Sequence, residues 1–130
     1  EVPEVCEKGK KSLESHIECF GYLKSRDDYL NVLSQGDVFL STALHEFYGV
    51  STLEAVWMGC LPVCPNRLAY PEFFPKTCLY NTERQLVKKL KFFCTNKLKT
   101  REIRENVLGE LDMSKFSWTK LRDVYCKMLL

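Results

Sequence analysis

From Asp37 to Cys64 the chain reads DVFLSTALHEFYGVSTLEAVWMGCLPVC, a run in which three patterns succeed one another. Residues 37–42 are rich in apolar and β-branched side chains and predict a short strand. Residues 50–58 carry apolar side chains at helical spacing and predict a helix. The apolar run at 61–64 has the length of a buried strand. Two strands joined by a helix predict a parallel pair, and therefore an α/β fold with helices on the faces of the sheet.

The residues before this run predict two more helices and one more strand. Loosely helical spacing in a lysine-rich stretch predicts a helix over residues 3–15. Polar and apolar side chains alternate over residues 16–20, which predicts a short strand. Ser25 resembles an N-cap followed by an acidic first turn, and it predicts a helix that ends before Gly36.

Helices dominate the prediction for the rest of the chain. Three prolines, at positions 65, 71 and 75, predict that the segment between them is irregular. Helices are then predicted from near Thr82, over about 100–108 and over 120–130. In a parallel sheet with this alternation, ligands bind beyond the carboxyl ends of the strands.

Composition narrows the class of protein. The 130 residues are 45% hydrophobic and 28% charged, which is typical of one globular domain. A net charge of +2 is too small to indicate nucleic-acid binding, so any basic surface has to be local. Seven irregularly spaced cysteines disfavour a secreted disulfide framework and indicate a reducing compartment. Because neither a membrane span nor a signal peptide is apparent, we expect a soluble protein of the cytoplasm or the nucleus.

Two carboxylates carry the chemical information in the central run. Glu46 and Glu54 are separated by seven residues across the start of the predicted helix. Eight residues of helix rise about 12 Å, whereas the carboxylate pair of a glycosidase lies about 5–9.5 Å apart. The spacing therefore disfavours glycoside hydrolysis. It suits two carboxylates that accept hydrogen bonds from hydroxyls at opposite ends of an elongated ligand such as a nucleotide sugar.

The start of the same helix offers a place for an anion. The backbone N–H groups of Gly49, Val50 and Ser51 are helix N-terminal donors, and the helix dipole favours an anion such as a diphosphate there. Gly49 allows the backbone to approach a ligand closely.

These motifs resemble those of a known enzyme family. The run HEFYGVSTLEA at 45–55, followed by GCLP at 59–62, resembles the E-x7-E donor motif of retaining GT-B glycosyltransferases. Together with CPNRLAYPE at 64–72 and FSW at 116–118, it is similar to the glycosyltransferase-like domain-containing proteins identified as tRNA-queuosine α-mannosyltransferases. The resemblance covers nearly the whole chain and implies a Rossmann-like parallel sheet.

The resemblance implies a role for each candidate site residue. Glu46 would be the catalytic residue and contact the sugar hydroxyls, and Glu54 would contact the ribose hydroxyls. The amides of Tyr48, Gly49, Val50 and Ser51 would bind the diphosphate. Gly21, Tyr22 and Leu23 match the segment that lies near the nucleotide base in that family.

The resemblance also implies parts that this sequence does not contain. Such enzymes have an Arg/Lys pair near the start of the donor domain and an N-terminal acceptor domain. We therefore expect residues 1–130 to form a partial C-terminal nucleotide-sugar-binding domain of a longer enzyme, inactive on its own. The implied reaction is the retaining transfer of mannose from GDP-mannose to queuosine in tRNA. Neither a metal nor any other cofactor is expected, nor is a membrane partner; the sequence leaves the oligomeric state open.

Other interpretations remain open. The chain could be a non-catalytic nucleotide-sugar-binding module, or a glycosyltransferase with a lipid, glycan or protein acceptor. The basic run from Arg84 to Arg104 fits either a solvated helix face or a contact of Lys88, Lys89 and Lys91 with tRNA phosphates. Cys60 and Cys64 lack a second pair of ligands, so we interpret them as core residues and not as a metal site. We interpret His45 as structural.

Overall fold

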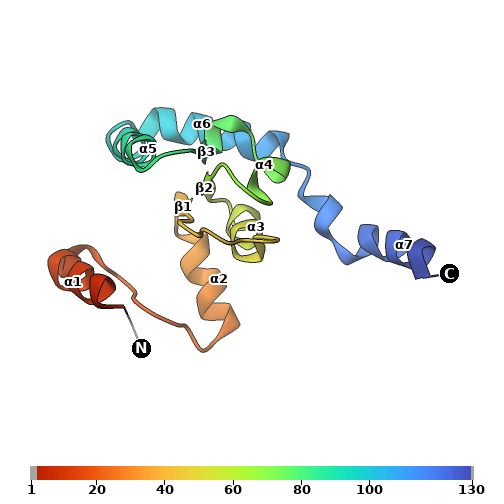
Figure 1. Cartoon of the computed structure of the whole chain (residues 1–130), viewed down its shortest axis with the longest axis horizontal. Coiled ribbons are helices and arrows are strands. Elements are labelled where there is room, and N and C mark those ends of the chain that lie inside the picture. The colour runs from red at the N-terminus through yellow and green to blue at the C-terminus, as the bar shows by residue number, and fades with distance from the viewer. Residues whose placement is uncertain (1–2, 130) are drawn as a thin grey trace.

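The fold is a parallel sheet with helices on both faces, as the sequence predicted. The computed structural model describes residues 3–129. The strands are β1 (Val38–Leu40), β2 (Leu61–Pro65) and β3 (Leu79–Tyr80), in the order β1-β2-β3. Both pairs are parallel, with Val38 opposite Leu61 and Cys64 opposite Leu79. Figure 1 shows the strands stacked at the centre of the molecule.

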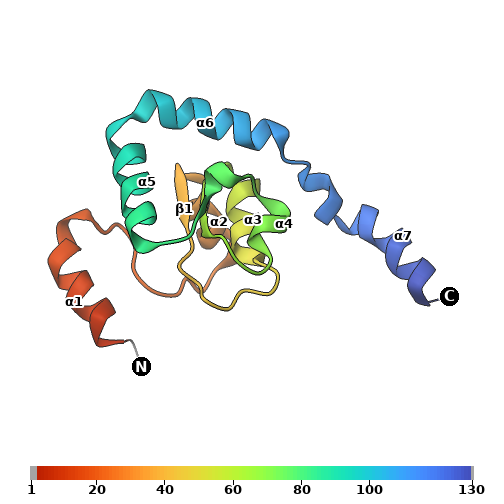
Figure 2. The ribbon, with the colours of Figure 1, turned by 45° about the horizontal axis from the view of Figure 1, so that its top comes forward.

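Within the described residues, seven α-helices surround or extend from this sheet. They are α1 (Glu4–Leu13), α2 (Arg26–Ser34), α3 (Val50–Trp57), α4 (Tyr70–Phe73), α5 (Glu83–Thr95), α6 (Lys97–Glu110) and α7 (Trp118–Leu129). Short 3-10 turns lie at Glu14–His16, Lys76–Cys78 and Met113–Phe116. Helices α2 and α3 lie on one side of the strands and α5 and α6 on the other (Figure 1). In Figure 2, α7 projects away from the sheet, and neither α1 nor α7 contains a buried residue.

The core forms around β2, every residue of which is buried. Leu53 and Val56 of α3 belong to the same buried cluster as Phe93 of α5 and Val107 of α6. A strand covered on both faces needs a continuous apolar sequence, because neither set of alternating side chains meets water. The apolar run at 61–64 meets this condition.

Two of the predicted helix starts are confirmed at atomic detail. The Ser25 hydroxyl accepts a hydrogen bond from the Asp28 N–H at the start of α2. The Thr82 hydroxyl accepts one from the Gln85 N–H at the start of α5. Both contacts satisfy donors that the first turn of a helix leaves unpaired. The predicted helices over 100–108 and 120–130 also exist, as α6 and α7 with wider bounds; Leu130 lies outside the described residues.

The prediction of a strand at 16–20 is wrong. His16 ends a 3-10 turn, and residues 17–20 are assigned no strand. An alternating sequence becomes a strand only when its backbone groups pair with a neighbouring strand, and within residues 3–129 no strand pairs with this segment. Sequence alternation alone did not reveal that the partner was missing.

The proline-containing segment is more regular than predicted. Between Pro65 and Pro75 it contains α4, with Pro71 in its first turn, and β3 follows after Pro75. A proline in the first turn costs no helical hydrogen bond, because the N–H that it lacks would have had no partner in the helix. The three prolines therefore do not keep this segment irregular.

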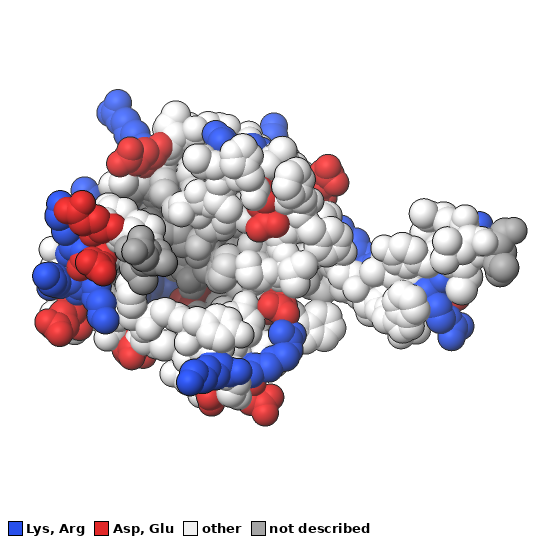
Figure 3. Space-filling model, turned by 60° about the horizontal axis from the view of Figure 1, so that its bottom comes forward, with Lys and Arg blue, Asp and Glu red and all other residues white. Residues whose placement is uncertain are grey.

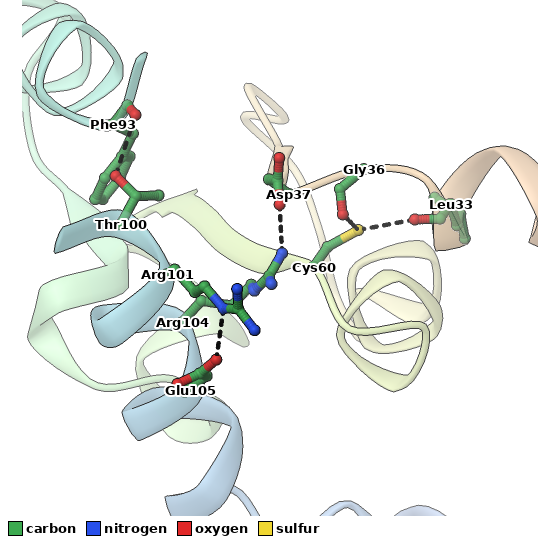
Figure 4. A network of polar contacts seen from close by, with 9 residues as sticks. All are labelled: Leu33, Gly36, Asp37, Cys60, Phe93, Thr100, Arg101, Arg104 and Glu105. Carbon is green, nitrogen blue, oxygen red and sulfur yellow. Dashed lines mark hydrogen bonds and ion pairs between the residues drawn. The ribbon is translucent and has the colours of Figure 1, made fainter. Parts of the chain in front are cut away.

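Polar contacts fasten the helices to the sheet (Figure 4). The Cys60 thiol, at the end of the α3–β2 turn, lies 3.1 Å from the Leu33 carbonyl oxygen and 3.3 Å from that of Gly36. Arg104 of α6 pairs with Asp37, the residue before β1. The buried Thr100 hydroxyl lies 3.1 Å from the Phe93 carbonyl oxygen and so links α6 to α5.

We expect Cys60→Ala to lower the free energy of unfolding by about 1–2 kcal/mol, because it removes the donor that the two carbonyl groups share and leaves a small void. Chemical denaturation followed by circular dichroism measures this loss. Cys94→Ala is the matched control, since Cys94 is exposed, and its effect should stay within about 0.5 kcal/mol. Equal stability of the two variants would show that the thiol contacts contribute nothing.

Candidate functional site

The loop between β1 and α3 starts from a fixed point at Ser41. The Ser41 N–H donates to the Val63 carbonyl oxygen at 3.0 Å, which continues the pairing of β1 with β2. The Ser41 and Tyr70 hydroxyl oxygens are 2.7 Å apart, and the Tyr80 hydroxyl donates to the Ser41 carbonyl oxygen at 2.9 Å. Residues from α4 and β3 therefore hold the carboxyl end of β1, where ligands of such sheets bind.

Glu46 folds back onto the start of α3. Its Oε1 atom accepts a hydrogen bond of 2.8 Å from the Gly49 N–H and one of 3.3 Å from the Tyr48 N–H. The carboxylate is thereby held at the positive end of the helix dipole, where a negative charge is favoured. The structure thus brings together the catalytic candidate Glu46 and the predicted diphosphate-binding segment.

This contact divides the predicted donor amides into two sets. The Tyr48 and Gly49 N–H groups hold Glu46 in this structure. The first hydrogen bond within α3 joins the Leu53 N–H to the Gly49 carbonyl oxygen, so the N–H groups of Val50 and Ser51 precede the helical ladder. Of the predicted donors, these two amides have no partner in the ladder of α3 and are left for an anion; the Thr52 N–H also precedes the ladder.

Gly49 is required by the geometry of this turn. It has φ of 77° and ψ of 37°, a left-handed conformation that other residues adopt at a cost. A Cβ atom there would lie 3.2 Å from Cε1 of Tyr70. The Tyr70 ring is buried and its hydroxyl is bound to Ser41, so it cannot easily move away.

Glu54 is held by a residue that the sequence analysis did not identify. Its Oε1 atom accepts a hydrogen bond of 2.7 Å from Nη2 of Arg26, the first residue of α2. Tyr29 of α2 is also adjacent: burial raises its pKa, and the Glu54 carboxylate raises this pKa further. A carboxylate flanked by the apolar residues Leu53 and Ala55 needs such partners.

The predicted base-binding segment borders a pocket. Gly21, Tyr22 and Leu23 line a cavity of about 470 Å³, together with Lys24, Ser25, Arg26 and Tyr29. Gly21 has φ of 100°, so the chain turns sharply there. Arg26 belongs both to this pocket and to the ion pair with Glu54, and it therefore connects two site segments that the sequence analysis placed near the nucleoside.

One physical signal could have identified Arg26. A cation in the first turn of a helix opposes the helix dipole, so an arginine directly after the N-cap suggests a partner elsewhere in the fold. Tyr70 and Tyr80 gave no comparable signal, because a tyrosine hydroxyl can bind almost any polar neighbour.

The three lysines proposed for tRNA contact differ in their environments. Lys88 and Lys91 are exposed on α5, whereas Lys89 is half-buried. The Lys89 ammonium donates to the Thr77 carbonyl oxygen at 2.7 Å. Figure 3 shows Lys and Arg side chains interspersed with Asp and Glu over one face of the molecule. Any phosphate contact of α5 therefore falls to Lys88 and Lys91.

The cysteines between α3 and α5 are core residues. Cys60, Cys64 and Cys78 are buried, and burial raises the pKa of Cys64 to about 12 and that of Cys78 to about 11. These thiols stay protonated at neutral pH and are poor metal ligands. In the part of the chain that the structure describes, no group of three or more His, Cys, Asp or Glu residues could hold a metal ion. His45 is exposed.

No helix within residues 3–129 has both the length and the apolar character to cross a membrane.

Comparison with known proteins supports the resemblance seen in the sequence. No family model matches the chain. A tRNA-queuosine alpha-mannosyltransferase of Drosophila melanogaster is 42% identical to it over 125 residues. The matched region covers 96% of this chain and 33% of that enzyme, so the chain spans about a third of the relative's length. The predicted similarity to this group of glycosyltransferases is therefore confirmed over nearly the whole chain.

We expect Gly49→Ala to lower the free energy of unfolding by about 1–2 kcal/mol, because the new Cβ meets Tyr70 and the left-handed backbone is strained. Gly109→Ala provides the control: Gly109 lies within α6 with no atom near its missing Cβ. That change should stabilise the protein by about 0.5–1 kcal/mol. Thermal unfolding of both variants checks the pair, and a Gly49→Ala protein as stable as the parent would contradict the strained turn.

Proposed function

We propose that this chain is the donor-binding part of a glycosyltransferase that transfers mannose from GDP-mannose to queuosine in tRNA, with retention of configuration. The observation that carries the proposal is the conformation of Glu46, held by two amides at the start of α3. The 42% identity to the Drosophila enzyme supports the choice of sugar and acceptor. The rest of the polypeptide would contribute the acceptor site.

Glu46 is built to orient a sugar. Its Oε1 atom is engaged by the Tyr48 and Gly49 N–H groups. Within residues 3–129 no hydrogen bond engages Oε2, so this oxygen is available to accept a hydrogen bond from a mannose hydroxyl. A carboxylate fixed in this way needs no reorganisation when the sugar binds.

The start of α3 is suited to the leaving diphosphate. The N–H groups of Val50 and Ser51 and the helix dipole favour negative charge, which increases as the sugar–phosphate bond breaks. Catalysis in this proposal is electrostatic and requires no metal. Glu54 and the pocket at Gly21–Leu23 would bind the ribose and the base of the same donor.

Two alternative functions, a non-catalytic binding module and a glycosyltransferase with another acceptor, differ from this one in what they require of the site. A non-catalytic nucleotide-sugar-binding module would use the same donor site, but it has no need for a sugar-orienting carboxylate such as Glu46. A lipid, glycan or protein acceptor would leave the donor site unchanged, and the mannosyltransferase name of the relative favours tRNA. The reaction on tRNA would occur in the cytoplasm or the nucleus.

We expect Glu46→Gln in the complete enzyme to lower the rate of mannosyl transfer by about 10²-fold, equivalent to about 2–4 kcal/mol. Glutamine keeps an oxygen that can accept from Gly49 and Tyr48, so the loop should keep its shape while the charge is lost. Glu54→Gln should mainly weaken donor affinity. Transfer of labelled mannose to tRNA containing queuosine and equilibrium binding of GDP-mannose measure the two effects.

Wild-type rates and donor affinities in both variants would remove the donor-site assignment. Intact GDP-mannose binding by the parent enzyme, with no transfer to any tRNA, would favour the non-catalytic module or a different acceptor.

We expect Lys88→Ala combined with Lys91→Ala to weaken tRNA binding. The slope of the logarithm of the binding constant against the logarithm of the salt concentration should become shallower by about 0.9 per lost contact, if counterion release resembles that of duplex nucleic acid. Lys89→Ala should leave the slope unchanged, because its ammonium is bound to Thr77. Lys120→Ala with Lys127→Ala, on α7, removes the same charge as a control. An unchanged slope in the double variant would show that neither lysine contacts tRNA and that both belong to the solvated face of α5.

A further inference from the structure

Arg26 occupies a position that is unfavourable for its own helix. It is the first residue of α2, directly after the Ser25 N-cap. The positive end of the helix dipole repels a cation at this point, whereas the neighbouring Asp27 and Asp28 fit it well. A residue that breaks a local rule in this way is commonly retained for a role elsewhere in the structure.

The ion pair of Arg26 does little for stability. The Arg26 side chain is 67% exposed, and ion pairs that are so accessible to water are weak. The Glu54 side chain, in contrast, is only 23% exposed. The contact of 2.7 Å therefore acts mainly on the orientation of Glu54, the less exposed partner.

Arg26 also lies at the pocket that borders Gly21–Leu23. Both Arg26 and Tyr29 line this cavity of about 470 Å³, and both interact with Glu54. The guanidinium holds Oε1, and the Tyr29 hydroxyl also interacts with this carboxylate. These two contacts orient the carboxylate and leave it with further lone pairs that can accept hydrogen bonds from a ligand.

We propose that Arg26 is a positioning residue, which holds Glu54 oriented so that its carboxylate accepts hydrogen bonds from the ribose hydroxyls of the nucleotide. This inference rests on the proposed function, because it takes the ribose of a nucleoside diphosphate as the ligand of Glu54. Arg26 acts through Glu54 and does not contact the phosphates. Its contribution therefore depends on the presence of the ribose hydroxyls.

The test compares two nucleotides that differ only at the ribose. Equilibrium binding of GDP and of 2′,3′-dideoxy-GDP is measured in the complete enzyme for the parent, Arg26→Ala, Arg26→Lys and Glu54→Gln. Arg26→Ala should weaken GDP binding by about tenfold, the loss of one oriented hydrogen bond to a charged group. Its affinity for the dideoxy nucleotide should stay within about twofold of the parent. Arg26→Lys should restore part of the GDP affinity, because lysine keeps the charge but not the planar donor.

The double variant Arg26→Ala/Glu54→Gln adds a coupling test. If Arg26 acts through Glu54, the double variant should bind GDP no more weakly than Glu54→Gln alone. Arg101→Ala is the matched control, since it breaks the exposed Arg101–Glu105 pair of α6; it should bind both nucleotides as the parent does. Thermal unfolding should place Arg26→Ala and Arg101→Ala close to the parent.

Three results would overturn the inference. Equal weakening of both nucleotides by Arg26→Ala would show that Arg26 acts on the phosphates. No change with either nucleotide would make the Arg26–Glu54 contact an ordinary surface ion pair. Additive losses in the double variant would separate Arg26 from Glu54. By contrast, a parent enzyme that binds neither nucleotide, or binds both equally, would refute the proposed donor site itself and the inference with it.

Discussion

Burial on both faces forces β2 to pair along both of its edges. Each of its five residues is shielded from water, and buried backbone N–H and C=O groups need hydrogen-bond partners. β1 supplies them along one edge and β3 along the other. This pairing places the carboxyl end of β1 beside Tyr70 and Tyr80, whose hydroxyls hold Ser41. The position of the loop that carries Glu46 therefore depends on a strand that contributes no residue to the site.

The two site carboxylates are held by different means. Glu46 is held by backbone amides within three residues of it, so its conformation belongs to the loop and the start of α3. Glu54 is held by Arg26, which is 28 positions away in the sequence. A local contact forms whenever its loop forms, whereas the Arg26 contact also needs α2 to pack against α3. The proposed donor site thus combines one locally built element with one that the tertiary structure assembles.

The helices that flank the sheet are fixed by a small number of polar contacts. Cys60 joins the end of α2 to the start of β2, and the Arg104–Asp37 pair joins α6 to the start of β1 (Figure 4). α7 lies beyond these contacts and buries no residue. The region around β2 therefore contains the interactions that position the site, and the two outermost helices contribute little to it.

The sequence by itself determined the elements that short-range patterns encode. Apolar patterns predicted β1, α3 and β2 in order and a helix from near Thr82, and the Ser25 cap predicted where α2 begins; all of these are confirmed. The E-x7-E run, together with the runs at 59–62, 64–72 and 116–118, also gave the resemblance that the Drosophila relative supports. Only the tertiary structure decided that residues 16–20 form no strand, that β3 pairs with β2, and that Arg26 holds Glu54. The physical reason is the distance along the chain over which each group finds its partner. A helix cap finds its hydrogen-bond partner within a few residues, whereas a strand edge or a half-buried carboxylate such as Glu54 needs a partner whose position depends on how the chain folds.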